Sequence, residues 1–384
     1  RTEKVMDEKE YRRRERIREQ RKQERIRKVR RQRIIWGVNL GLLLVLGLVF
    51  TVRGIQSNAA QEREKQAKKK QEEKKAKEPE VISLTISAAG DCTLGTDEYF
   101  YYPTSLPAKF EKEGAAFFFE KVKPVFEADD LTIVNMEGTL TEETDRKPNE
   151  QFCFKGDKEL VNILTEGSVE AANLANNHTI DYGEKSYTDT IEVLEEEGIS
   201  AFGNETTSIV DVKGIQVGLL GTYELDRHMD CEEEMIQNIE NLKEEGAQMI
   251  IASFHWGIER ANIPNETQVA LAHSAIDHGA DLVLGHHPHV LQGIEEYKGK
   301  NIVYSLANFC FGGNSGPKDM DTMIFQQTFT FTDGKLQEDN VTNVIPCKVS
   351  SVYETGVNNY QPMPVEGETG DAILERIRQY TDAL

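Results

Sequence analysis

The chain has 384 residues, a formal net charge of −21 and five cysteines, enough for one large α/β domain with extensions. An odd number of cysteines and the absence of any Cys-x-x-Cys pair argue against a disulfide framework and against a thiolate zinc site. Charge is unevenly divided: residues 1–33 hold 16 Lys+Arg against 7 acids, net +9, whereas residues 81–384 hold 20 against 53, net −33.

The N-terminal segments predict a membrane anchor. Residues 34–52 contain no charged residue, and at ~1.5 Å per residue they reach roughly 28 Å, close to the thickness of a hydrocarbon core. A cleaved signal peptide is the rival interpretation, but this apolar run is longer than a signal h-region. The positive excess places residues 1–33 in the cytoplasm against anionic lipid, which accounts for their charge without nucleic acid. Residues 53–80 form a charged stalk, and an extracellular domain follows over 81–384.

From residue 81 onwards, short apolar strands alternate with helices, a pattern typical of βαβ units in a largely parallel sheet. The predicted strands are 81–88, 131–135, 169–174, 216–220, 249–254 and 282–284. The predicted helices are 115–127, 158–165, 184–197, 233–245 and 266–278. After residue 290 the pattern predicts antiparallel strands over 290–296, 301–306, 322–332 and 344–352, and then a closing helix over 371–383.

The segment DLVLGHHPHVLQG, residues 281–293, carries His286, His287 and His289 directly after a buried strand. Pro288 fixes its own φ and favours extended geometry for the residue before it. Residues two apart in an extended segment share a face, so His287 and His289 are predicted to point at one object. Neutral imidazole is a common ligand of Zn, Mn and Fe. A loop of exposed histidines without a ligand is the alternative.

Polar side chains also follow the other predicted strands, at the edge where α/β sheets bind ligands. Asp91 follows the first strand, Glu137 the second, Asn177 and His178 the third, and His255 the fourth. Taken singly, these residues have ordinary explanations: a helix cap, a turn carboxylate, turn amides or a core histidine. Together with the paired histidines, they predict one oxygen and nitrogen ligand set for one or two ions of Mn, Fe or Zn.

Several of these segments resemble the successive motifs of a known family. They are GDCTLG, VNMEGTLT, NLANNHTIDYG, SFHWGIE, GHHPHVLQGIE and YSLANFCFG, between about residues 82 and 312. The resemblance is to the CapA/PgsA capsule-biosynthesis family, membrane-anchored proteins associated with bacterial poly-γ-glutamate synthesis. That family is related to the calcineurin-like metallophosphoesterases, which implies an α/β/β/α sandwich with a dinuclear metal centre.

The resemblance also implies roles for individual residues. The implied metal ligands are Asp91, Glu137, Asn177, His255, His287 and His289. If the site is catalytic, a metal-bound water would supply hydroxide, and His178, oriented by Asp181, would act as general acid. The candidates for shaping a substrate pocket are Trp256, Glu259, Tyr304 and Asn308, of which Trp256 and Tyr304 are equally suited to packing.

Two departures from the metallophosphoesterase pattern leave the function open. Thr93 stands where those enzymes carry a histidine, and Glu137 stands in place of a bridging aspartate, so a second metal and ordinary two-metal hydrolysis are in doubt. Three functions remain: synthesis or export of a capsular polymer beside membrane-bound synthase or ligase subunits, metal-dependent hydrolysis of envelope phosphoesters or amides, and non-catalytic polymer binding. The ligand would be an anionic polymer or a small molecule. A polyanion would be repelled by most of an acidic domain, so binding would need a metal or a local basic cleft.

Overall fold

The structure, a computed structural model, describes residues 41–42 and 79–384. The predicted basic arm, almost all of the predicted anchor and almost all of the predicted stalk lie outside the described residues. Within the described part of the chain, no helix is both long and apolar enough to cross a membrane. Pro79–Leu384 forms a compact unit.

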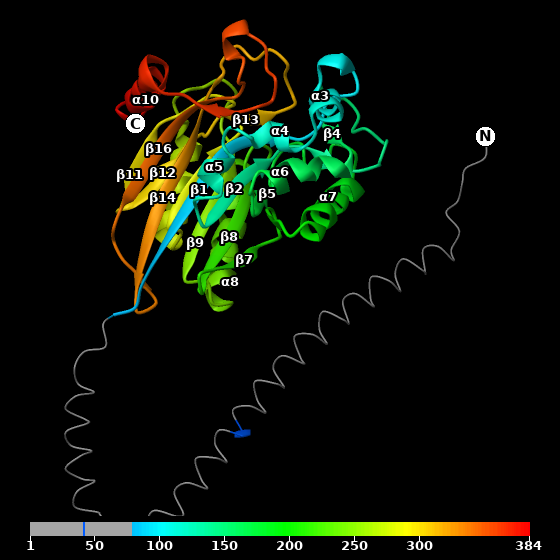
Figure 1. Cartoon of the computed structure of the whole chain (residues 1–384). Helices are drawn as coiled ribbons and strands as arrows, with labels where there is room; N and C mark the ends of the chain where they lie inside the picture. The colour runs from blue at the N-terminus through cyan, green and yellow to red at the C-terminus, as the bar shows by residue number, and fades with distance from the viewer. Residues whose placement is uncertain (1–40, 43–78) are drawn as a thin grey trace, which may run out of the picture. The chain divides into compact units, whose positions relative to one another are not determined.

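Two mixed sheets form the centre of this unit (Figure 1). The first sheet contains β1 (Val81–Thr93), β2 (Leu131–Met136), β5 (Ala171–Asn173), β6 (Ser200–Phe202), β13 (Asn308–Phe311), β14 (Asp321–Thr332), β15 (Lys335–Leu336), β16 (Val341–Lys348) and β17 (Met363–Pro364). Its main order is β17-β16-β14-β1-β2-β5-β6, with β13 beside β1 and β15 beside β14. The second sheet, in order, contains β11 (Ile294–Tyr297), β12 (Lys300–Val303), β10 (Leu282–His286), β9 (Met249–His255), β8 (Ile215–Tyr223) and β7 (Ser208–Val212). A separate ladder joins β3 (Thr139–Leu140) to β4 (Lys155–Gly156).

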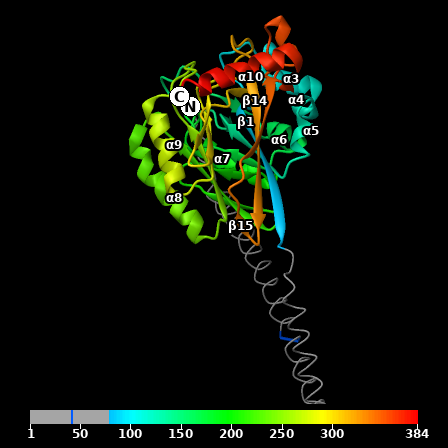
Figure 2. The same ribbon diagram turned by 90° about the vertical axis from the view of Figure 1, so that its left-hand side faces the viewer.

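Helices cover the outer face of each sheet, and an apolar core fills the space between the sheets. The helices on the first sheet are α3 (Leu106–Glu113), α4 (Ala116–Phe119), α5 (Lys123–Phe126), α6 (Asn162–Glu166) and α7 (Glu184–Glu196). The second sheet is covered by α8 (Glu232–Glu244) and α9 (Glu266–His278). Figure 2 shows α8 and α9 on one side and α3, α4, α5 and α6 on the other, with α10 (Gly367–Thr381) across one end, where it packs on β16 and β11. Short 3₁₀ turns occur at Tyr102–Thr104, Lys158–Val161, His228–Cys231 and Tyr353–Thr355.

The predicted alternation of strands and helices is confirmed, and two helix-covered sheets agree with the sandwich that the family resemblance implies. The largely parallel pairing expected from the alternation is wrong. The strands divide between two sheets, and β1 lies parallel to β2 but antiparallel to β14. The predicted antiparallel strand over 301–306 lies antiparallel to β11 but parallel to β10. The predicted helix over 115–127 is two short helices, because Pro124 in the first turn of α5 has no N–H to donate to a continuous helix.

Candidate metal centre

Parallel pairing brings the carboxyl ends of five strands to one edge of the sandwich. Asp91 in β1 lies in register with Asn135 of β2 and with Asn308 of β13. At the end of the second sheet, His255 of β9 lies in register with His286 of β10. The loops that follow β2, β5 and β10 add Glu137, the Asn177–Asp181 segment and the remaining histidines. The structure therefore gathers the implied ligands from both sheets.

Asp91 is fully buried and is held from several directions. Its Oδ1 accepts a hydrogen bond from Asn135 Nδ2 at 2.8 Å and lies 3.4 Å from His286 Nδ1. Its Oδ2 lies 3.2 Å from His289 Nδ1 and accepts the backbone N–H of His287 at 3.4 Å. Although burial opposes ionisation, the contacts with His286 and His289 hold the pKa of Asp91 well below its usual value. Asp91 is therefore a fixed negative charge.

Glu137 is also fully buried, and neither of its carboxylate oxygens has a hydrogen-bond partner. Its Oε1 faces three imidazoles, 3.8 Å from His289 Nε2, 3.9 Å from His178 Nε2 and 4.0 Å from His255 Nε2. An isolated buried carboxylate is strongly unfavourable unless a cation accompanies it. Ligand atoms of Asp91, Glu137 and His289 lie within 4.8 Å of one another, so these three residues could hold a metal ion.

The ionisation of this triad shows how much negative charge the site concentrates. Burial, reinforced by the charge of Asp91, raises the pKa of Glu137 to about 7. Burial disfavours protonation of His289, but Glu137 and Asp91 outweigh it and raise the pKa of His289 to about 9. A proton on His289 thus offsets the two carboxylates, and a bound divalent cation would do the same with more charge.

Asn177, His255 and His287 form a second group of contacting side chains beside Glu137. His255 Nε2–H donates to Asn177 Oδ1 at 2.7 Å, and the His255 and His287 rings lie 4.9 Å apart. Burial and the neighbouring His287 hold the pKa of His255 well below its usual value. Burial and the charge of His289 lower that of His287 to about 3. Both rings are therefore neutral, the form that binds metals.

His178 and Asp181 form a hydrogen-bonded pair beside Glu137. His178 Nδ1–H donates to Asp181 Oδ2 at 2.7 Å, and the same oxygen accepts the backbone N–H of Phe154 at 2.6 Å. Burial disfavours the imidazolium, but the contact with Asp181 outweighs it and raises the pKa of His178. The bond fixes the ring so that Nε2 faces Glu137.

The predicted extended geometry around Pro288 is wrong. His287 and His289 have φ values of +93° and +56°, so the segment bends instead of following a strand. The two ring centroids still lie 5.5 Å apart, but the rings contact different neighbours. His289 contacts the two carboxylates, and His287 packs against His255.

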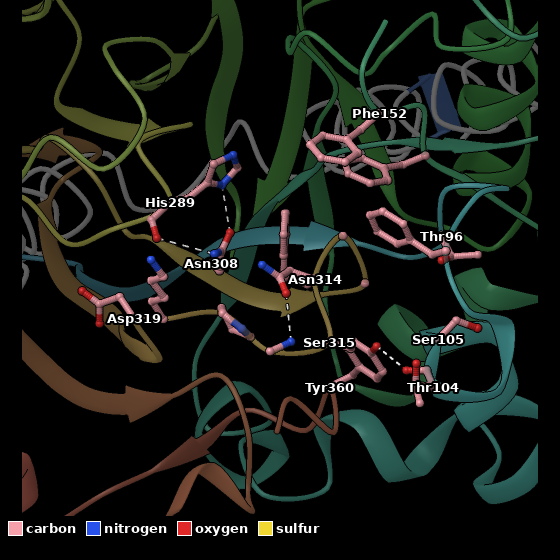
Figure 3. A pocket seen from close by; sticks show the side chains of 18 of the residues that line it. Thr96, Thr104, Ser105, Phe152, His289, Asn308, Asn314, Ser315, Asp319 and Tyr360 are labelled. Carbon is pink, nitrogen blue, oxygen red and sulfur yellow. Dashed lines mark hydrogen bonds between the residues drawn. The ribbon is translucent and has the colours of Figure 1, made fainter. Parts of the chain in front are cut away.

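A pocket of about 760 Å³ opens beside His178 and His289 and is also lined by Glu259 and Asn308 (Figure 3). Asn308 Oδ1 lies 2.9 Å from His289 Nδ1. Trp256 and Tyr304 do not line this pocket. Both are fully buried in the apolar layer under α8 and α9, where Trp256 Nε1–H donates to the Tyr304 carbonyl at 2.9 Å. Their placement favours the packing role.

Two residues outside the predicted ligand set organise the site. Asn135 Nδ2 donates to Asp91 and its Oδ1 accepts from Asn173 Nδ2 at 3.0 Å, so one amide links β1, β2 and β5. His286 contacts Asp91, although the sequence placed only its two neighbours in the ligand set. The position of Asn135 at a strand end, two residues before Glu137, is the signal that could have singled it out. Thr93 is buried nearby, and its Oγ1 has no partner among the described residues.

The chain is similar to a known protein family over the segment that carries these residues. The family model described as "Bacterial capsule synthesis protein PGA_cap" matches residues 85–313, which contain every predicted site residue. The chain is 30% identical to the PGA biosynthesis protein CapA of Bacillus subtilis over 221 residues, 52% of this chain and 58% of that protein. It is 30% identical to the capsule biosynthesis protein CapA of Bacillus anthracis over 260 residues, 61% of each chain. A probable polyglutamine synthesis accessory protein of Mycobacterium tuberculosis is 26% identical over 258 residues, 58% of this chain and 67% of that protein.

Among solved structures, a hypothetical protein from Thermus thermophilus aligns with a TM-score of 0.44 and 14% identity, over 68% of this chain and 99% of that one. The chain spans about three fifths of the length of the Bacillus relatives. The family model covers more than half of the chain, from β1 to the segment after β13. The protein therefore belongs to the bacterial capsule synthesis protein PGA_cap family.

Proposed function

We propose that this protein is a membrane-anchored component of the synthesis or export of a capsular poly-γ-glutamate polymer and that it acts through a divalent metal centre. The observation that carries the metal centre is the Glu137 carboxylate, which is fully buried, unpartnered and surrounded by imidazoles. The family and the names of the Bacillus relatives support the polymer. The uncharged run over residues 34–52 supports the anchor, with the main domain extracellular and the basic arm cytoplasmic.

The residues fit a metal ion. Asp91, Glu137 and His289 would hold one ion, and Asn177, His255 and His287 would be the ligands of a second ion. Oxygen and imidazole donors suit Mn, Fe or Zn. Since Thr93 offers only a hydroxyl where metallophosphoesterases carry an imidazole, the ligand set favours one bound ion over two.

When bound, a divalent cation would polarise a substrate oxygen or lower the pKa of a water. The protein's own contribution is the placement of a proton. His178 is fixed by Asp181, carries a raised pKa and lines the pocket, so its Nε2–H can donate to a leaving group. These groups support hydrolysis or transfer at a phosphoester or amide bond of an envelope substrate as the activity of the site.

A non-catalytic scaffold is the second candidate. Thr93 favours it, because a buried, unpartnered hydroxyl stands where an imidazole would complete a first metal position. In that case the domain would bind the polymer beside membrane-bound synthase or ligase subunits without cleaving it.

Gene deletion followed by complementation tests the proposal. We expect deletion to remove or shorten the surface polymer, wild type to restore it, and Glu137→Gln to fail at equal protein level. Lys335→Gln, on β15 and away from the site, is the control and should restore the polymer. Unchanged polymer after deletion would contradict the proposed function. Full restoration of the polymer by Glu137→Gln would contradict the metal-dependent activity and favour the non-catalytic scaffold.

A further inference from the structure

Most basic side chains of the acidic domain form ion pairs or hydrogen bonds with neighbouring groups. Residues 81–384 contain 20 Lys+Arg, and 14 of them form ion pairs with acidic side chains. Lys155 and Lys243 donate to backbone carbonyls instead. Within this described part of the chain, the basic side chains without an ion pair or hydrogen bond are those of Lys158, Arg260, Lys318 and Lys335.

Two of these four free cations, Arg260 and Lys318, line the pocket beside the candidate metal centre. Both are exposed, so they are available to a ligand. The backbone N–H of Arg260 donates to the Pro288 carbonyl at 2.8 Å, which ties the Arg260 turn to the loop that carries His289. The backbone of Arg260 is therefore held in place, while its guanidinium has no partner.

The acids of the same pocket do not cancel this charge. Asp319 is paired with Arg376 at 2.7 Å, and Glu259 is the remaining acid that lines the pocket. Among the residues that line the pocket, Arg260 and Lys318 therefore leave a local positive excess. In a domain of net charge −33, this is a place where a polyanion meets attraction rather than repulsion.

Aromatic side chains form another part of the pocket lining. The Phe152 and Phe154 rings are stacked with centroids 6.2 Å apart, and Phe154 packs against His178 at 4.5 Å. Tyr99 and Tyr101 line the rim with 76% and 73% of their surface exposed. Figure 3 shows Phe152 and Asp319 well apart in this view. Exposed aromatic faces favour contact with apolar stretches of a ligand.

We infer that Arg260 and Lys318 bind carboxylates of an extended oligomer, while the aromatic wall packs against the methylene groups between its carboxylates. A γ-linked glutamate strand has this chemistry, because each unit carries one carboxylate and consecutive main-chain methylenes. This inference rests on the proposed function and deepens it, because it assigns the residues that recognise the polymer. Arg260 and Lys318 are binding residues, distinct from the candidate metal ligands.

The test is equilibrium binding of a short synthetic γ-linked glutamate oligomer to the full-length chain, measured at several salt concentrations. Arg260→Gln and Lys318→Gln should each weaken binding by about three- to fivefold, the range of an exposed ion pair, and the double variant by about tenfold or more. The affinity of the double variant should also depend less on salt. Lys335→Gln removes another free, exposed lysine away from the pocket and should bind like wild type. Phe152→Ala should weaken binding without changing its salt dependence.

Several outcomes would overturn the inference: equal binding by the double variant, an equal loss in Lys335→Gln, or equally tight binding of a neutral γ-linked glutamine oligomer. Tighter binding of a glycerol-phosphate oligomer would show that Arg260 and Lys318 recognise phosphates and not carboxylates. If wild type does not bind the glutamate oligomer but gene deletion removes the polymer, the inference fails and the proposed function stands. Metal content should be unchanged in Arg260→Gln and Lys318→Gln, because neither residue belongs to the ligand set.

Discussion

Glu137→Gln separates a metal ligand from a structural carboxylate. Burial raises the pKa of Glu137 to about 7 from a usual value of 4.5, so ionising it in the folded, metal-free protein opposes folding by about 3 kcal/mol near pH 8. This penalty is absent below about pH 4.5, grows between about pH 4.5 and about 7, and is complete above that. The protonated carboxyl of Glu137 and a glutamine amide are both buried without a partner, so each carries a similar cost of about 1–3 kcal/mol. We therefore expect the metal-free variant to match wild type near pH 4.5 and to be more stable than wild type near pH 8.

Metal should reverse the comparison. At 100 times its dissociation constant, a ligand of the folded state raises the free energy of unfolding by about 2.7 kcal/mol. We expect Mn²⁺ or Zn²⁺ to give this gain in wild type and almost none in Glu137→Gln, measured by urea unfolding of the full-length chain with chelator or with metal. Glu259→Gln removes an exposed carboxylate of the same pocket and should keep the gain.

Two results would refute this reasoning about Glu137. An equal metal-induced gain in Glu137→Gln would show that the carboxylate is not a ligand. A loss of about 3–5 kcal/mol in chelator near pH 8 would show that the attraction between ionised Glu137 and protonated His289 outweighs the cost of burying the carboxylate.

Three further predictions concern neighbouring groups. Asp181→Asn should lower the pKa of His178, measured by NMR titration, because the Asp181 contact raises it; an unchanged value would contradict the pairing. Glu170→Gln should stabilise the protein increasingly as pH rises from about 4.5 to about 7, measured by thermal unfolding, because burial raises the pKa of Glu170 to about 7 and its ionisation opposes folding above that pH. A pH-independent difference would contradict that assignment. Thr93→Val should raise the free energy of unfolding by about 1 kcal/mol without changing metal content, because its buried hydroxyl has no partner. Loss of metal in this variant would instead identify the hydroxyl as a ligand.

The sequence predicts the strands that carry the site better than it predicts how they are arranged. Apolar runs ending in Asp91, Glu137 and His255 identify β1, β2 and β9 because buried strands are short and uniformly apolar. The division into two sheets depends on which strands pair across long loops, and strands of both sheets read alike. The helix α3 was missed although Ser105 caps it and Pro107 lies in its first turn, both ordinary helix-start signals.

Within the site, residue types were more informative than local geometry. The motif spacing indicated His287 and His289, but their left-handed backbone could not be deduced from Pro288, which favours an extended predecessor. The sequence also could not identify Arg260 and Lys318 as unpaired cations, because whether a side chain has a partner depends on the residues that fold around it. A basic cleft was expected only as a requirement for binding a polyanion, without residues assigned to it.

The most direct test of the metal centre is elemental analysis of the purified full-length chain beside a His287→Ala/His289→Ala variant. We predict about one equivalent or more of Mn, Fe or Zn in wild type and its loss in the variant, with both proteins folded by circular dichroism. No bound metal in wild type, even after incubation with each ion, would contradict the metal centre and leave the polymer-binding scaffold as the function of the fold.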